Sequence, residues 1–118
     1  MWEALDASGL APGYVHGVVI QGQPVAFCRI SADGPAYAFT DACPSCDARL
    51  AGGSLQRAPG SRLGTAILTC PGCREHYDVS RAGAGIDDPS RHLFPLPVLE
   101  RAGRLEIAGP ERATSLPA

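Results

Sequence analysis

Short apolar runs alternate with turn-forming residues along most of the chain. The runs are four to seven residues long and rich in Val, Ile, Leu, Tyr or Phe, and Gly, Pro, Asp and Ser gather between them. Runs of this length and composition, bounded by turn residues, predict β-strands. The predicted strands are residues 14–20, 24–30, 36–40, 66–70, 76–79, 95–101 and 104–108.

The segments between these runs favour tight turns over helices. Gly22, Gly34 and Gly103 each stand between two consecutive runs, as expected for meandering hairpins. No stretch of roughly 12 residues or more places apolar side chains at helical spacing, and the 11 prolines and 14 glycines disfavour long helices. Only residues 2–7, WEALDA, are expected to form at most a turn or two of helix. The fold is therefore predicted to be all-β.

Two polar segments are predicted to lie outside the core. Residues 51–64, AGGSLQRAPGSRLG, are expected to form a surface connection with a short hairpin around Leu55. Residues 109–118 are polar and proline-bearing and are expected to be a flexible tail. With 118 residues in total, the remaining residues 1–108 are predicted to form a single domain.

Charge and hydropathy exclude several classes of partner. The net charge of -2 and the isoelectric point near 5.8 leave no basic face for nucleic acid. The apolar runs are far shorter than the roughly 20 residues that a membrane span requires. The first ten residues do not resemble a signal peptide, so a cytoplasmic location is expected. In that reducing compartment, paired cysteines more often bind metal or cycle catalytically than form structural disulfides.

Four cysteines form the strongest chemical signal. Cys43 and Cys46 are followed 24 residues after Cys46 by Cys70 and Cys73, each pair being a Cys-Pro-x-Cys turn after a predicted strand. A chain that leaves a strand and turns back directs two such side chains at one point, while N–H groups of the turn face the sulfurs. The four thiolates are therefore predicted to bind metal.

Other uses of the cysteines and histidines are less favoured. Redox dithiols need a following helix, and neither pair is followed by a predicted helix. Two disulfides would suit a secreted chain, and nothing in the sequence points to secretion. Cys28 lies inside a predicted strand and is interpreted as a small buried hydrophobic residue. His76 is expected to lie near the metal site without binding metal. His16 and His92 are assigned no role.

The order of these motifs resembles a Rieske-type ferredoxin domain from about residue 15 to residue 107. The matching positions are Cys43 and Pro44, Leu50 and Gly53, Cys70 and Pro71, Tyr77 and Asp78, Gly83, and the PLPV segment at 95–98. The resemblance implies an antiparallel β-sandwich with a small two-loop metal-binding subdomain, similar to zinc ribbons and rubredoxins, at about residues 40–79.

The departures from that family fall on its metal ligands. The family's two histidine positions hold Ser45 and Cys73, and Cys46 follows Ser45 directly. Two arrangements of the cysteines could replace the family's set of metal ligands. Cys43 with Cys70 and Cys46 with Cys73 would hold an all-thiolate [2Fe-2S] cluster, or all four would hold a single Fe or Zn ion. The spacing favours the single ion, because a thiolate reaches less far than an imidazole, whereas the Rieske framework favours a cluster.

The resemblance implies an electron carrier or accessory subunit of an oxidoreductase system. Its partner would be a reductase, hydrogenase or oxygenase component. The alternative is a structural zinc module that binds a partner protein, and a third reading is a small subunit similar to those of assimilatory nitrite reductases. Residues 81–109, together with the two Cys-Pro-x-Cys loops, also resemble the Rieske-like segment associated with NifU-like and hydrogenase maturation proteins. An independent enzyme is not expected, because no nucleophile with an adjacent base is evident and Asp87 and Asp88 are interpreted as a turn.

Overall fold

The computed structural model describes residues 2–31, 34–57, 66–101 and 104–109, and over these residues the predicted all-β fold is confirmed. The described part holds antiparallel strands, one short 3-10 helix and no α-helix. The elements are β1 (Trp2–Leu5), β2 (His16–Ile20), β3 (Gln23–Arg29), β4 (Ala36–Thr40), β5 (Ser54–Arg57), β6 (Ala66–Thr69), β7 (His76–Asp78), η1 (Val79–Arg81), β8 (Ala84–Gly85), β9 (Pro95–Leu96), β10 (Val98–Arg101) and β11 (Arg104–Ala108).

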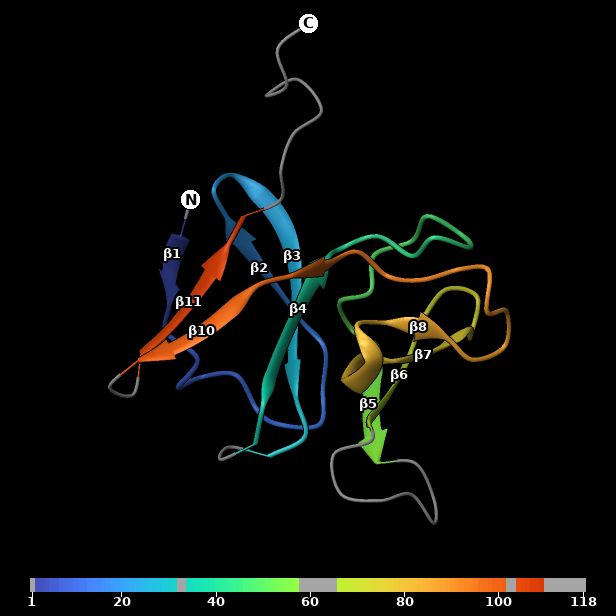
Figure 1. The fold of residues 1–118 in the computed structure, drawn as a ribbon, viewed down its shortest axis with the longest axis horizontal. Helices are drawn as coiled ribbons and strands as arrows, with labels where there is room; N and C mark the ends of the chain where they lie inside the picture. Colours follow the sequence, from blue (N-terminus) through green and yellow to red (C-terminus); the bar gives the residue numbers. More distant parts are fainter. Residues whose placement is uncertain (1, 32–33, 58–65, 102–103, 110–118) are drawn as a thin grey trace, which may run out of the picture.

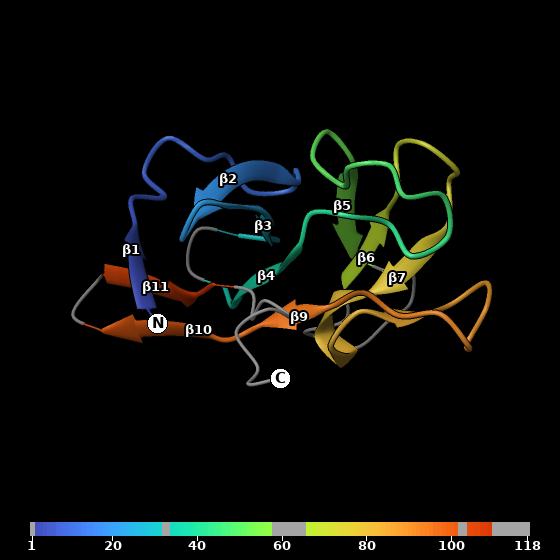
Figure 2. The ribbon, with the colours of Figure 1, turned by 90° about the horizontal axis from the view of Figure 1, so that it is seen from above.

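The strands form three antiparallel sheets arranged side by side. One sheet has the order β1-β11-β10, the second β2-β3-β4-β9 and the third β5-β6-β7-β8. In Figure 1 the sheet of β2, β3 and β4 stands between the other two, and the view from above in Figure 2 gives the same sequence of layers. Three strands of the third sheet lie within residues 40–79, where the metal-binding subdomain is expected, and β8 lies beyond them.

Strand β3 contributes side chains to both buried clusters of the molecule. Val25 and Phe27 pack into one buried cluster with residues of β11, whereas Ala26 and Cys28 pack into a second cluster with residues of β5, β6 and β7. Successive side chains of a strand point to opposite faces, so a strand covered on both faces needs an unbroken apolar run. That is the reason for the continuous apolar stretch from Val25 to Cys28.

Residues 2–5 form strand β1, and the turn or two of helix expected there is wrong. Trp2 to Leu5 pair with Ala108 to Leu105 of β11, and exposed and half-buried side chains alternate along β1. The helix propensity of Ala and Leu is weak compared with the backbone hydrogen bonds and packing that the sheet edge provides.

Residues 54–57, expected to belong to a surface connection, form strand β5. Leu55 is only 3% exposed and lies directly opposite Leu68 of β6, so residues 54–57 form part of the sheet and Leu55 belongs to the core. Leu55, around which a short hairpin was expected, lies inside β5, and the connection to β6, residues 58–65, is outside the described part. The predicted turn at Gly103 and most of the predicted tail, residues 110–118, are also outside it.

The single run predicted at 95–101 is divided between two sheets. Strand β9 pairs with β4 in the middle sheet, and β10 pairs with β11 in the outer one, with Pro97 between them. Proline cannot donate to a strand ladder and is tolerated at sheet edges, which is where Pro95 lies. Among the described residues, no helix has the length and hydropathy to cross a bilayer.

Candidate metal site

The first cysteine loop follows β4 and is closed by two backbone hydrogen bonds. The Cys43 N–H donates to the Ala48 carbonyl at 2.8 Å, and the Asp47 N–H donates to the Cys43 carbonyl at 2.8 Å. Asp47 has φ of 63°, a left-handed conformation in which aspartate is among the better-tolerated residues. The turn brings Cys46 back toward Cys43.

The second loop, between β6 and β7, repeats this backbone pattern. The Cys70 N–H donates to the Glu75 carbonyl at 3.0 Å, and the Arg74 N–H donates to the Cys70 carbonyl at 3.0 Å. Arg74 has φ of 65°, at the position that Asp47 occupies in the first loop. Two Cys-Pro-x-Cys segments therefore fold into the same knuckle, as their common sequence predicts.

The four sulfurs of the two loops converge at one point. All four Sγ atoms lie within 4.8 Å of one another, and the pairs Cys43–Cys73 and Cys46–Cys70 are 3.7 Å apart. These short pairs join opposite loops. Cys43 and Cys70 are buried, Cys73 is half-buried and Cys46 is exposed. The cluster therefore has a protected inner side and one edge open to solvent.

The sulfur spacing matches the coordination shell of one small ion. A regular tetrahedron with metal–sulfur bonds of about 2.3 Å has sulfur–sulfur edges of about 3.8 Å. A [2Fe-2S] rhomb needs two irons and two sulfides among the four thiolates, and thiolates on different irons are then much farther apart than thiolates on one iron. The two loops would have to separate to admit it.

Tyr77 supplies a hydrogen bond to the inner side of the cluster. Its buried hydroxyl lies 3.3 Å from the Cys43 sulfur. Burial opposes ionisation of Cys43, but hydrogen bonds from Tyr77 and from two backbone N–H groups outweigh burial and lower the pKa of the Cys43 thiol to about 7. Burial, together with the neighbouring thiol, raises the pKa of the Tyr77 hydroxyl, which keeps it a hydrogen-bond donor.

The other inner thiol ionises much less easily. Burial raises the pKa of the Cys70 thiol to about 12, although the Gly72 N–H lies 3.3 Å from its sulfur, and burial also raises the pKa of Cys73. Several thiolates this close together repel one another. A bound cation removes that repulsion and lets all four sulfurs be thiolates, which is the form that binds metal.

Asp41 holds the first loop in place, a role that the sequence analysis missed. Its Oδ1 accepts hydrogen bonds from the N–H groups of Leu50 at 2.6 Å and Ala51 at 3.1 Å, so one carboxylate ties the beginning of the loop to its end. The side chain is 1% exposed, and its Oδ2 lies 3.6 Å from the Arg49 guanidinium. The only sequence signal is an acidic residue two positions before Cys43.

Residues 85–93 make hydrogen bonds to the first cysteine loop and to the end of the second. Arg91 donates to the Pro44 carbonyl of the first loop at 3.2 Å, and the Asp87 carboxylate accepts from the His76 backbone N–H at 2.8 Å and contacts His76 Nδ1 at 2.9 Å. His76 is outside the cysteine cluster, as expected. Asp88 accepts from the Ser90 N–H, which confirms the predicted turn.

The remaining cysteine and histidines lie as the sequence suggests. Cys28 is fully buried in the core, and burial raises the pKa of its thiol to about 12. His16 Nε2 contacts the Ala11 carbonyl at 2.8 Å, and His92 Nδ1 contacts the Leu93 carbonyl at 3.0 Å. None of the three belongs to the sulfur cluster.

Substitution of Gly72 by alanine is expected to weaken metal retention at least about tenfold, without unfolding the rest of the molecule. A Cβ at Gly72 would lie 2.9 Å from the Ala48 Cβ and 3.1 Å from the Cys46 sulfur, so it would push the two loops apart. The rate of metal transfer to a chelator measures the effect. Gly9→Ala is the matched control, because nothing lies within 4 Å of its added Cβ. Equal rates for the two variants would contradict the expectation.

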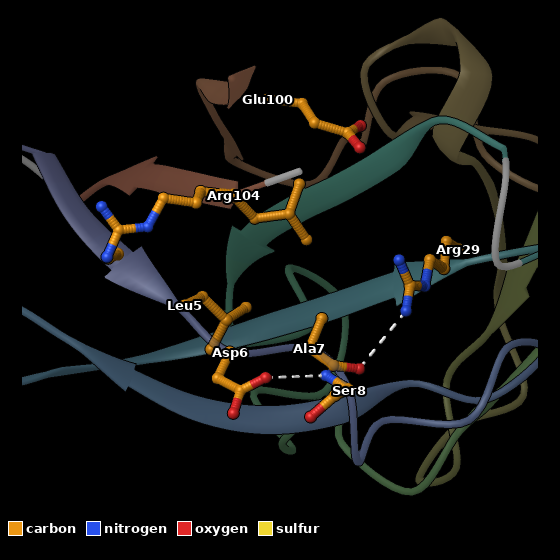
Figure 3. A pocket seen from close by; sticks show the side chains of 9 residues that line it. Leu5, Asp6, Ala7, Ser8, Arg29, Glu100 and Arg104 are labelled. Carbon is orange, nitrogen blue, oxygen red and sulfur yellow. Dashed lines mark hydrogen bonds between the residues drawn. The ribbon is translucent and has the colours of Figure 1, made fainter. Parts of the chain in front are cut away.

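A larger cavity, of about 580 Å³, lies away from the cysteine loops (Figure 3). Its wall includes Arg29, which donates to the Ala7 carbonyl at 3.3 Å, and Asp6, which accepts from the Ser8 N–H at 3.0 Å. Hydrogen bonds from Ser8 lower the pKa of Asp6. With Glu100 and Arg104 also in the wall, acids and arginines balance, so the cavity has no charge preference.

Known structures share this fold over its whole length. A protein described as the small subunit of an NADH-dependent nitrite reductase from Mycobacterium tuberculosis is 25% identical, with a TM-score of 0.76 over 95% of this chain and 97% of that one. The ferredoxin of carbazole 1,9a-dioxygenase from Nocardioides aromaticivorans IC177 is 22% identical, with a TM-score of 0.70 over 89% and 93%.

A third structure contains the fold as one part of a larger chain. Dicamba monooxygenase is 23% identical, with a TM-score of 0.68 over all of this chain but only 36% of its own. Neither the protein-family models nor the curated proteins gave a match. The chain thus has the fold of Rieske-type ferredoxins and nitrite reductase small subunits, and its cysteine tetrad is placed where a metal could bind.

Proposed function

We propose that this protein is a small electron-transfer subunit that binds one iron ion through Cys43, Cys46, Cys70 and Cys73. The convergence of the four sulfurs within 4.8 Å carries the proposal. Four soft thiolates in a tetrahedral arrangement suit Fe or Zn and are unsuited to Mg²⁺ or Ca²⁺. A bound iron would accept and return one electron.

The fold supports an accessory role in an oxidoreductase system. The structures that match over nearly their whole length are a nitrite reductase small subunit and a ferredoxin component, and neither is described as the catalytic chain. A redox partner protein, such as a reductase, a hydrogenase or an oxygenase component, follows from this role. The likeness of residues 81–109 to segments associated with NifU-like proteins remains a prediction.

The sulfur spacing favours one iron over a [2Fe-2S] cluster. The 3.7 Å separations join Cys43 to Cys73 and Cys46 to Cys70, whereas the cluster arrangement pairs Cys43 with Cys70. All four sulfurs are mutual neighbours, as in a single tetrahedral shell. The scaffold resembles that of a Rieske protein, but its binding loops have the knuckle form of a mononuclear site.

The burial of the cysteines defines how an electron would reach the site. Cys43 and Cys70 are covered by the core, which limits access of water and oxygen to the inner side. Cys46 is exposed, and orbitals of a ligating sulfur extend the redox centre to the surface. A partner that covers Cys46 would therefore approach closest to the metal.

Replacing Tyr77 with phenylalanine is expected to lower the reduction potential of the iron form by some tens of millivolts. The Tyr77 hydroxyl donates toward the Cys43 sulfur, and a donated hydrogen bond stabilises the more negative, reduced state. A potentiometric titration measures the change. Tyr37→Phe is the control, because Tyr37 packs against the same core without being in the sulfur cluster. A Tyr77 variant with an unchanged potential would contradict the role.

A structural zinc site is the second candidate, and the same tetrahedral spacing favours it. Zn²⁺ binds four thiolates at about the distances that fit these sulfurs, and it binds more tightly than Fe²⁺ in most such sites. In that case the metal would only fasten the two loops, and the surface around Cys46 would serve to bind a partner. The residues that bind the metal are the same in both candidates.

A redox titration of the protein purified without oxygen distinguishes the two functions. The electron-transfer proposal expects a reversible one-electron change in the visible thiolate-to-iron absorption, with one equivalent of electrons per bound metal. A colourless protein with stoichiometric zinc and no measurable potential would overturn the electron-transfer proposal and leave the zinc module, because Zn²⁺ has no redox change.

A further inference from the structure

A small polar cleft lies beside the second cysteine loop. It has a volume of about 250 Å³ and lies between the exit of the first loop, at Gly52 to Ser54, and residues Thr69 to Pro71 with Arg74. Gly53 lies so close to β6 that a Cβ there would clash with the Thr69 carbonyl. The floor of the cleft is therefore fixed by backbone packing.

The strand register places two hydroxyl groups side by side in this cleft. Ser54 lies directly opposite Thr69, and directly opposite residues of an antiparallel pair point to the same face, with Cβ atoms about 4.5–5.5 Å apart. Leu55 and Leu68, one position along each strand, are buried on the other face. Neither hydroxyl makes a hydrogen bond to any residue that the structure describes, so both are available to a ligand.

Arg74 adds a positive charge to the same cleft. Its left-handed conformation is fixed by the hydrogen bond from its N–H to the Cys70 carbonyl. Within the described part of the chain its guanidinium makes no ion pair, whereas those of Arg49, Arg81 and Arg91 each lie near an aspartate. A guanidinium without an ion pair and two hydroxyls without a hydrogen bond, as far as the described residues show, therefore line a single small cavity.

An exposed aromatic side chain extends this surface. Tyr14 forms a bridge with Ser54 on the side opposite Thr69, so its ring lies on the same face, and it is 62% exposed. Across three neighbouring chain segments, the face presents an aromatic ring and then two hydroxyls. Tyrosine and arginine, with tryptophan, are enriched among the residues that contribute most to binding at protein–protein interfaces.

We propose that this cleft, formed by Ser54, Thr69 and Arg74 beside Tyr14, is a binding site for a single carboxylate group. A guanidinium fork matches a carboxylate in shape, and hydroxyls donate further hydrogen bonds to it. The one cation matches one negative charge, whereas a phosphate group carries about -1.5 to -2 at neutral pH. A cleft of this volume is smaller than the roughly 300–1,000 Å³ of sites that enclose whole ligands.

The proposal does not depend on the identity of the metal. The three polar side chains belong to strands β5 and β6 and to the knuckle of the second loop, and none is one of the four cysteines. A carboxylate bound here would lie next to the Cys70 backbone. It could belong to a free small acid or to an aspartate or glutamate side chain of a partner protein.

Saturation-transfer NMR with the purified protein tests the proposal, with acetate as the first probe. Saturable binding in the millimolar range is expected, and Arg74→Gln is expected to weaken it about tenfold. Arg49→Gln is the matched control, because Arg49 is 69% exposed but does not line the cleft, and it should bind acetate like the unchanged protein. Ser54→Ala, which removes one hydroxyl, is a second variant and is expected to show a smaller loss.

Two further probes separate the sources and the class of ligand. Tighter binding of N-acetyl-glutamate methylamide than of acetate would support a protein side chain as the natural ligand, and equal binding would support a free small acid. Inorganic phosphate, measured by its displacement of acetate, should bind more weakly than acetate. The proposal would be overturned if phosphate bound more tightly than acetate or if acetate binding were not saturable. Equal weakening of acetate binding in the Arg74 and Arg49 variants would also overturn it.

Discussion

Cys70→Ser is expected to abolish stoichiometric metal binding and to lower the free energy of unfolding of the metal-bound protein by several kcal/mol. Serine is a poor ligand for iron or zinc. The Cys70 sulfur is fully buried and lies 3.7 Å from that of Cys46, so the loss leaves a three-thiolate site with an unfilled inner corner. Metal content per chain and thermal unfolding with and without a chelator measure the two effects.

Cys28→Ala provides the matched control for that substitution. Cys28 is also a fully buried cysteine, but it packs in the core outside the sulfur cluster. The substitution is expected to cost about 1 kcal/mol through a small cavity and to leave the metal content unchanged. Full metal retention in the Cys70 variant, or equal metal loss in both variants, would contradict the assignment of ligands.

Asp41→Ala is expected to cost about 2–4 kcal/mol of stability and to accelerate metal release. The buried carboxylate accepts the N–H groups of Leu50 and Ala51, and its loss leaves both N–H groups without an acceptor inside the core. The end of the first loop would then no longer be fixed relative to its beginning. The measurements are thermal unfolding and the rate of metal transfer to a chelator.

Two comparison variants separate the loop effect from general destabilisation. Asp41→Asn keeps one carbonyl oxygen for the same two N–H groups and is expected to lose less than half as much stability. Asp6→Ala removes an exposed aspartate that accepts only from the Ser8 backbone and hydroxyl, and it should leave metal release unchanged. Metal release that is equally slow in Asp41→Ala and Asp6→Ala would show that Asp41 does not position the loop.

Local patterns predicted most of the strands and the two cysteine turns because their causes are local. The run from Val25 to Cys28 is apolar because both of its faces are covered, and each Cys-Pro-x-Cys turn forms its own knuckle. Convergence of the two knuckles was expected because two Cys-Pro-x-Cys pairs a couple of dozen residues apart are typical of one four-thiolate site. The resemblance to Rieske-type domains gave the order of these elements.

Features that depend on distant partners could not be predicted in the same way. Residues 2–5 form a strand only because β11, about a hundred residues later, offers an edge, and residues 54–57 form one because Leu55 meets Leu68. The role of Asp41 arises from N–H groups nine and ten residues away. A single acidic residue in a polar segment carries no sign of such contacts.

The number of metal ions also lay beyond the sequence. The spacing of the cysteines is compatible with a cluster or with one ion, and the family resemblance and the reach of a thiolate pointed in opposite directions. The 4.8 Å limit on the sulfur–sulfur distances depends on how closely the two knuckles approach. That approach is set by contacts such as Gly72 against Ala48, where only a residue without a side chain fits.

Metal and acid-labile sulfide analysis of the protein purified without oxygen shows whether the four cysteines hold one ion or a cluster. We expect one iron per chain, no sulfide, and loss of the iron in Cys70→Ser but not in Cys28→Ala. Two irons with two sulfides per chain would contradict this expectation, because the two loops would then hold a cluster that the sulfur spacing does not admit.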